Sequence, residues 1–217
     1  MKSNKSTLVE LKRAAPVVQT PPARRRNAVT TRHAILASAR SAFARAGYDG
    51  AGVREIASGA GVTAMLVNRY FGSKEQLFSE AIAESMAATT VVLPEILRSG
   101  ASGEDIAAAL IGITSAGATP LEGFQIMLRS ASSERAAIIG REQIEKHHQK
   151  AIAAALRGSL APQRAAVILS VIAGFQMMRQ MMALSALADA KSKTLVKVLG
   201  PVFQQLIDGE EPVNDKV

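Results

Sequence analysis

Apolar side chains recur along most of the chain at the spacing of α-helices. After residue 28 they return every three or four positions, and glycine or proline separates one run from the next. The runs cover residues 29–46, 53–58, 63–70, 73–94, 103–115, 121–131, 133–157, 163–187 and 193–208, with Pro94 expected to end or bend the fourth. No segment alternates like a strand and none repeats. The pattern predicts an all-α fold.

The second and third runs have the proportions of a helix-turn-helix unit. Two helices this short cannot bury a core alone, but crossed at a steep angle they can share one with the first run. Ala57 supplies a small residue for the close crossing, and Gly61 can adopt a positive φ in the turn. Ile56, Val62 and Val67 are the expected apolar contacts between the two helices.

Basic residues are concentrated in the first third of the chain. The 217 residues carry a net charge of +8, and the first 80 contain 13 basic and 5 acidic residues, whereas the rest contain 13 of each. Residues 1–28 combine prolines, the run Arg24–Arg26 and few large apolar groups, which is typical of a flexible basic arm. A basic segment beside a neutral body indicates binding to nucleic acid or to an anionic membrane surface.

Composition excludes several functional classes. The absence of cysteine excludes disulfides and thiolate metal sites, and the uncharged stretches 106–121 and 165–178 are too short to span a membrane. No secretory segment opens the chain, so a cytoplasmic location is expected. Common catalytic motifs are missing, and we predict neither catalytic residues nor a cofactor. His147 and His148 point about 100° apart on a helix, so solvent-facing or packed histidines are favoured over a metal site.

Residues 30–80 resemble, in order and without gaps, the DNA-binding domain of TetR-family (tetracycline-repressor-like) transcriptional regulators. The resembling stretches are Ile35 to Phe43, Gly47-Tyr48, Val53-Arg54-Glu55-Ile56-Ala57, Ala60-Gly61-Val62-Thr63 and Arg69 to Phe78. The resemblance implies a three-helix domain with a helix-turn-helix over 29–75, which binds DNA as a homodimer. It further implies a helical domain over 76–217 that dimerises and binds a small molecule.

Two positions depart from the family pattern. Where the family commonly has a Thr or Ser at the start of the second helix, this chain has Ala51-Gly52. Where the family often has a Gly and a Tyr in the recognition helix, this chain has Met65 and Asn68. The operator sequence therefore does not follow by analogy.

The run 63–70 offers side chains suited to the major groove. Asn68 can pair with adenine through its amide, Arg69 can bind guanine or phosphate, and Thr63, Ala64 and Met65 offer apolar groups to thymine methyls. The alternative is that some of these side chains only face solvent.

Three further residues are candidates for phosphate contacts. Tyr70 can donate a hydrogen bond to phosphate or pack against the first helix. Lys74 follows the cap of the fourth helix, where its charge opposes the helix dipole, and a phosphate between them would relieve that conflict. Arg54 begins the second helix, and Arg24–Arg26 can enter a flanking minor groove, with solvation as the alternative for each.

The neutral body offers a dimer surface and a candidate pocket. The run 163–187 is apolar on two faces, and with 193–208 it can form a four-helix dimer interface. Its cluster of methionines suits core or dimer packing better than a pocket. Phe124, Met127, Phe175 and Met178 are nevertheless the candidate ligand-binding residues. Few charges in the body favour an apolar or amphipathic ligand.

Together these features predict a ligand-responsive transcriptional regulator, a repressor that binds a palindromic operator as a homodimer and is released by a small molecule. The ligand would move the fourth helix and change the separation of the two recognition helices. The alternative hypothesis is a sequence-nonspecific DNA-binding architectural protein, or a protein of the membrane surface, with the basic arm as the binder.

Overall fold

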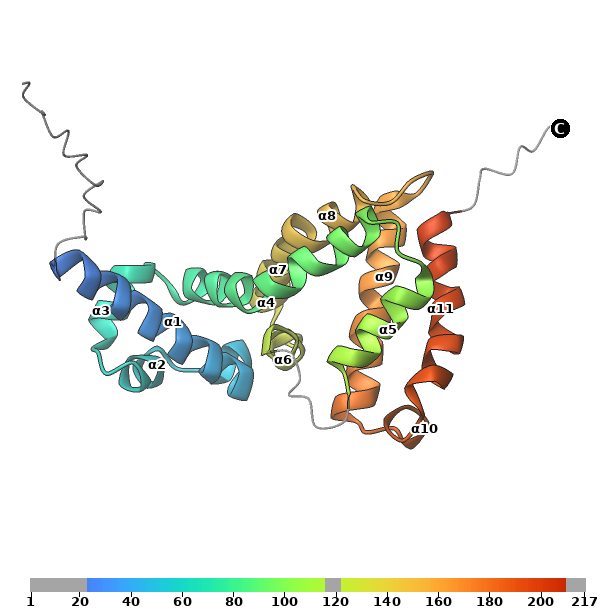
Figure 1. The fold of residues 1–217 in the computed structure, drawn as a ribbon. Coiled ribbons are helices and arrows are strands. Elements are labelled where there is room, and N and C mark those ends of the chain that lie inside the picture. Colours follow the sequence, from blue (N-terminus) through green and yellow to red (C-terminus); the bar gives the residue numbers. More distant parts are fainter. Residues whose placement is uncertain (1–22, 116–121, 210–217) are drawn as a thin grey trace, which may run out of the picture.

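A computed structural model describes residues 23–115 and 122–209, apart from the side chains of 23–26 and 87–92. The described residues form helices and no strand, which confirms the all-α fold (Figure 1). The α-helices are α1 (Ala23–Gly50), α2 (Val53–Gly59), α3 (Ala64–Phe71), α4 (Lys74–Arg98), α5 (Gly103–Ile113), α6 (Glu122–Ser130), α7 (Glu134–Gln143), α8 (Lys150–Ala153), α9 (Ala161–Gln176), α10 (Ser185–Ala188) and α11 (Ser192–Asp208). Two π-helical segments, η1 (Ile144–Gln149) and η2 (Met177–Met181), follow α7 and α9.

The helix bounds differ from the sequence prediction in three places. The first helix begins at Ala23 rather than near Val29, so Arg24–Arg26, predicted to belong to the flexible basic arm, are helical, because alanine and arginine favour helix without an apolar stripe. Residues 1–22 of the predicted arm lie outside the described residues. Helix α4 runs through Pro94 to Arg98, so the proline does not end it. The long runs 133–157 and 163–187 are interrupted by the π-helical segments.

Two apolar clusters form the interior. The first joins α1, α2, α3 and the N-terminal half of α4 to α6 and α7, with Phe43, Phe78 and Ile126 fully buried. The second joins the end of α4 to α5, α8, α9 and α11 around Ile168 and Phe203. Helix α4 contributes to both, and it runs from one end of the molecule into the helical bundle (Figure 1). No helix among the described residues has the length and apolarity needed to cross a bilayer.

Close packing of α5 against α11 depends on two glycines. A Cβ atom on Gly103 would collide with the backbone of α11 at Gly200, and one on Gly200 would lie 2.8 Å from the Cγ of Glu104. The side-chain amide of Gln204 also accepts a hydrogen bond from the Gly103 N–H at 2.7 Å. These contacts place α11 along the outer edge of the second cluster.

Candidate functional site

The turn between α2 and α3 has the hydrogen bonds of a tight helix-turn-helix. The N–H of Val62 donates to the Ala57 carbonyl at 2.9 Å, and Gly61 has a φ of +67°. Thr63 then caps α3, because its hydroxyl accepts a hydrogen bond from the Leu66 N–H at 3.3 Å. Ile56 and Val67 are buried and Val62 packs beside them. The predicted turn and the predicted apolar contacts between the two helices are confirmed.

Some of the predicted DNA-contacting residues of α3 are exposed, and others pack against the rest of the protein. Met65 is 81% exposed, and Asn68 and Arg69 are exposed one turn further along the same helix. Ala64 and Tyr70 are half-buried and pack against the first apolar cluster. The outward face of α3 therefore exposes the amide of Asn68, the guanidinium of Arg69 and the thioether of Met65 to solvent.

Ion pairs separate the basic residues of this region into two groups. Arg32 pairs with Glu80, Arg45 pairs with Glu55, and the Nε of Arg40 lies 2.6 Å from the carboxylate of Glu122. By contrast, Arg54 and Arg69 are exposed and form no salt bridge with the residues that the structure describes.

The two free guanidinium groups are both among the residues predicted to contact DNA. Arg54 lies near the start of α2, whose N-cap residue Gly52 provides no side-chain cap, in agreement with the departure from the family pattern. Lys74, at the start of α4, is half-buried with its ammonium group over the ring of Tyr48. Arg54 on α2, Arg69 on α3 and Lys74 at the start of α4 thus carry positive charge without a salt bridge to any residue whose side chain the structure describes.

Polar contacts join the end of α1 to α6 and its following turn. The backbone N–H of Tyr48 donates to the Ser130 hydroxyl at 2.9 Å, and the Ser133 hydroxyl donates to the Asp49 carboxylate at 3.2 Å. Gly47 has a φ of +68°, and a Cβ atom there would collide with the carbonyl oxygen of Arg129. Together with the pair of Arg40 and Glu122, these contacts attach the N-terminal helices to the body.

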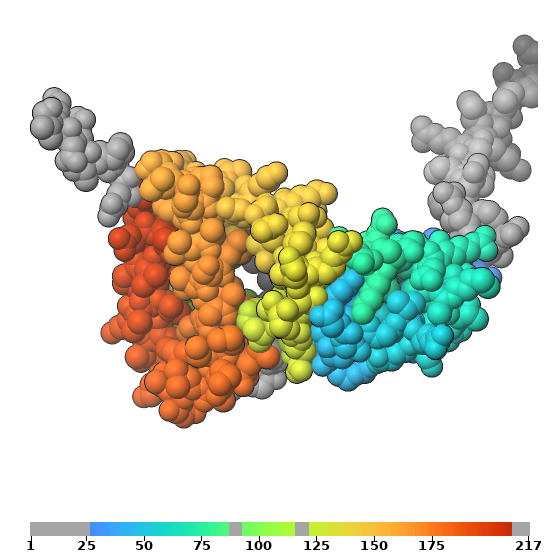
Figure 2. All heavy atoms as spheres, turned by 180° about the vertical axis from the view of Figure 1, so that it is seen from behind, coloured from blue at the N-terminus to red at the C-terminus, as the bar shows by residue number. Residues whose placement is uncertain are grey.

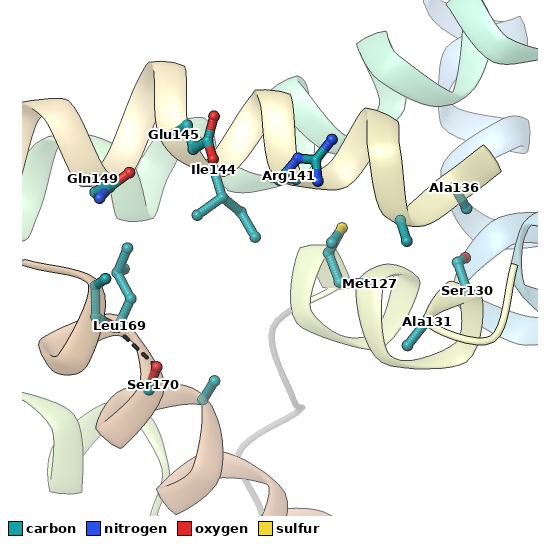
Figure 3. A pocket seen from close by; sticks show the side chains of 13 residues that line it. Met127, Ser130, Ala131, Ala136, Arg141, Ile144, Glu145, Gln149, Leu169 and Ser170 are labelled. Atoms are coloured by element: carbon teal, nitrogen blue, oxygen red, sulfur yellow. Dashed lines mark hydrogen bonds between the residues drawn. The ribbon is translucent and has the colours of Figure 1, made fainter. Parts of the chain in front are cut away.

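A cavity of about 530 Å³ lies between α6, α7, η1 and α9. The surface is hollowed between α7 and α9 (Figure 2), and Ile144 points into the space from above while Met127 points into it from α6 (Figure 3). Small side chains leave this space open. The lining residues are Met127, Ser130, Ala131, Ala136, Ala137, Arg141, Ile144, Glu145, Gln149, Ala166, Leu169, Ser170 and Ala173.

Only one of the four candidate ligand-binding residues lines this cavity. Met127 is part of the wall, whereas Phe124 is half-buried elsewhere on α6. Phe175 is buried in the second apolar cluster, with the guanidinium of Arg179 5.7 Å from its ring, and Met178 is 40% exposed. Their assignment as one ligand site remains a prediction.

The sequence did not predict the polar part of the cavity wall. Arg141, Glu145 and Gln149 lie one helical turn apart along α7 and η1. A polar stripe at that spacing is indistinguishable from an ordinary solvated helix face until the facing helix is known. The π-helical segment in the same wall is a feature that often accompanies functional sites.

The two neighbouring histidines have different environments. His148 is 6% exposed, while His147 is half-buried. Burial, followed by the electrostatic interaction with His147, lowers the pKa of His148. His148 is therefore neutral at neutral pH, as a packed histidine.

Two family models match the chain. One, described as bacterial regulatory proteins of the tetR family, matches residues 35–81, and the other, the tetracyclin repressor-like C-terminal domain, matches residues 101–207. Together they cover more than two thirds of the chain. No curated protein sequence matches it.

Solved structures share the fold. A transcriptional regulator from Rhodococcus sp. Rha1 has a TM-score of 0.58 at 19% identity, over 82% of this chain and 98% of that one. FadR from Bacillus subtilis, solved with stearoyl-CoA, has a TM-score of 0.53 at 17% identity, over 82% and 99%. NalD of Pseudomonas aeruginosa, the secondary repressor of the MexAB-OprM multidrug efflux pump, has 0.55 at 18%, over 79% and 95%. At these identities the likeness establishes the arrangement of helices.

Proposed function

Because the chain belongs to the TetR family of bacterial transcriptional regulators, we propose that it is a ligand-responsive repressor. It binds a palindromic operator as a homodimer and is released by a small molecule. The observation that carries the DNA-binding part is the outward face of α3, where Met65, Asn68 and Arg69 are exposed and Arg69 has no acidic partner among the described residues.

Helix α3 enters the major groove in this proposal. Asn68 and Arg69 contact base edges, Met65 contacts thymine methyls, and Thr63 lies at the N-terminal end of the helix. Arg54 and Lys74 bind the phosphates on either side. Ala64 and Tyr70, which pack against the first cluster, act mainly by holding α3 in place.

Helices α9 and α11 form the dimer surface in this proposal. They lie side by side at the end of the molecule away from α3 (Figures 1 and 2). Val167 and Met178 on α9 and η2 are 46% and 40% exposed, and Val198 and Val202 on α11 are 65% and 42% exposed. Apolar side chains exposed together on two adjacent helices mark a surface that a second subunit covers.

The cavity is the ligand site in this proposal. Its volume lies within the range of about 300–1,000 Å³ that small-molecule sites occupy. Its wall is mostly apolar, with Arg141, Glu145 and Gln149 along one side, which suits an amphipathic molecule. Because α6 contributes Met127 and Ser130 to the wall and also contacts the end of α1, a ligand that fits one arrangement better shifts the population of DNA-binding orientations.

Selection of bound fragments from genomic DNA tests the DNA-binding part. A repressor should enrich one palindrome whose half-sites lie about one helical turn apart, with at least 10³-fold preference over unrelated DNA. Arg69→Ala should lose discrimination among sequences, whereas Lys74→Ala should weaken all DNA binding and flatten its salt dependence.

Arg157→Ala is the matched control, because Arg157 is exposed and follows α8, a helix of the body that lies away from α3 (Figure 1). It should bind like the wild type. Equal affinity for every sequence would instead identify a sequence-nonspecific architectural protein, and unchanged footprints of both Arg69→Ala and Lys74→Ala would refute the proposed docking.

A further inference from the structure

We propose that Tyr48 is a positioning residue whose ring holds the ammonium group of Lys74 in place for a DNA phosphate, and that Ser130 in the cavity wall fixes the position of that ring. The inference rests on the proposed DNA-binding function and assigns a role to a residue that has no direct contact with DNA in that proposal.

The backbone of Tyr48 is fixed on the body side. Gly47 turns the chain with a φ of +68° against the carbonyl of Arg129, and the next N–H, that of Tyr48, donates to the Ser130 hydroxyl at 2.9 Å. Ser130 is 3% exposed, and Tyr48 is 7% exposed. The end of α1 can therefore move relative to α6 only if this buried hydrogen bond breaks.

The ring of Tyr48 is held by aromatic neighbours and carries Lys74 on its surface. Its centroid lies 4.9 Å from that of Phe78 in an edge contact and 6.3 Å from that of Phe43. The Nζ of Lys74 lies 4.6 Å from the Tyr48 centroid, which is a cation–π distance. The ring thus stabilises an ammonium group that the dipole of α4 would otherwise repel, and it does so before any phosphate arrives.

The hydroxyl of Tyr48 adds a second attachment. Burial, followed by the charge and hydrogen bond of Glu75, raises the pKa of Tyr48, so the hydroxyl stays protonated beside that carboxylate. Glu75 also lies 3.7 Å from the guanidinium of Arg135 at the start of α7. The contacts of Tyr48 therefore extend to α6 through Ser130 and to α7 through Glu75 and Arg135.

Both of these helices contribute to the cavity wall. Ser130 lines the cavity and accepts the Tyr48 N–H, while its own hydroxyl proton has no acceptor among the described residues. A hydrogen-bond acceptor on a bound molecule would take this proton while the oxygen keeps the Tyr48 N–H, and because a hydroxyl that donates becomes a better acceptor, it would hold Tyr48 more firmly. Occupancy of the cavity then changes how firmly Lys74 is held at the DNA surface.

The test compares Tyr48→Leu, Tyr48→Phe, Lys74→Gln and the double variant Tyr48→Leu/Lys74→Gln in binding to a selected duplex between 50 and 200 mM salt. Each lost phosphate contact should reduce the slope of log K against log salt by about 0.9, or about 1.8 for a dimer. Between 50 and 200 mM salt, the affinity of Lys74→Gln should therefore fall by a factor roughly twelve times smaller than the fall in the wild type. Tyr48→Leu should change the slope in the same direction, Tyr48→Phe should keep it, and the double variant should match Lys74→Gln.

A purely structural role of Tyr48 predicts a different result. Partial unfolding lowers the fraction of protein that binds and leaves the slope unchanged, so a wild-type slope for Tyr48→Leu would overturn the proposal. Additive slopes in the double variant would overturn it as well. If the wild type binds no duplex, the proposed function fails independently of the contact between Tyr48 and Lys74.

A measurement on the wild type applies even if Tyr48→Leu does not fold. In protein labelled with ¹³C-lysine, the ε-methylene protons of Lys74, assigned by their loss in Lys74→Gln, should be shifted upfield by the ring of Tyr48. Lys74 protons at the shift of solvent-exposed lysines would overturn the proposal.

Discussion

Replacement of Ser130 by alanine tests the attachment of the DNA-binding helices to the body. The change removes the acceptor of the buried Tyr48 N–H, now bonded at 2.9 Å. A buried donor without a partner costs about 1–3 kcal/mol. Because Ser130 lines a cavity large enough for water, solvent can recover part of that loss. We therefore expect Ser130→Ala to lower the free energy of unfolding by about 1–2 kcal/mol.

Urea-induced unfolding, followed by the helical circular dichroism signal, measures this effect. Protein concentration must be the same for all variants, because association shifts apparent stability. With an m-value of about 3 kcal/mol/M, the midpoint should fall by roughly 0.3–0.7 M. Ser170→Ala is the matched control, since Ser170 lines the same cavity but is exposed and donates only to the Ala166 carbonyl of its own helix at 2.9 Å. Its midpoint should stay within about 0.2 M of the wild type.

An identical midpoint for Ser130→Ala and Ser170→Ala would refute the reasoning. It would mean that the Tyr48 N–H finds an equivalent partner at no cost, and that the bond to Ser130 does not hold α1 against α6. A loss much above 3 kcal/mol would mean that the alanine variant rearranges the interface beyond one hydrogen bond.

Three further changes should alter stability in defined ways. Gly47→Ala should cost about 2–3 kcal/mol, because its φ of +68° and the collision with the neighbouring carbonyl both oppose a Cβ atom, whereas Gly52→Ala, with open space and a negative φ, should change the melting temperature little. Arg164→Met should cost about 2–4 kcal/mol and weaken dimerisation in sedimentation experiments, because the buried guanidinium donates to four carbonyls, two of them in the last turn of α11. Burial lowers the pKa of His148 in the folded state, so protonation favours unfolding and the free energy of unfolding should fall as pH drops below about 6.5. Urea titrations at several pH values should show that this loss is reduced in His148→Gln but retained in His147→Gln.

The helix-turn-helix could be predicted because its determinants are local. The positive φ of Gly61, the cap of α3 at Thr63 and the cap of α4 at Ser73 all lie within a few residues of the elements they shape. The packing of Ile56 and Val67 follows from helical spacing alone. Short-range pattern and turn chemistry therefore suffice for the N-terminal helices.

The cavity and its connection to the DNA-binding helices could not be predicted in the same way. The cavity depends on which small residues of α6, α7 and α9 face one another, and alanine gives no signal of direction in a sequence. The pair of Arg40 and Glu122 joins residues far apart in the chain. Lys74 illustrates the same limit, because its conflict with the helix dipole was visible from the sequence, whereas the ring of Tyr48 that relieves it was not.

The first apolar cluster has a consequence for the construction of chimeric regulators. The helices that read DNA share this cluster with Ile126 of α6 and Ala136 of α7, and their outer surface is joined to the body by side-chain pairs such as Arg40 with Glu122 and Asp49 with Ser133. A graft that exchanges residues 29–75 alone would separate these partners and place a foreign surface against α6. A DNA-binding domain that is to be transferred to another protein must therefore include the matching positions on α6 and in the turn that follows it.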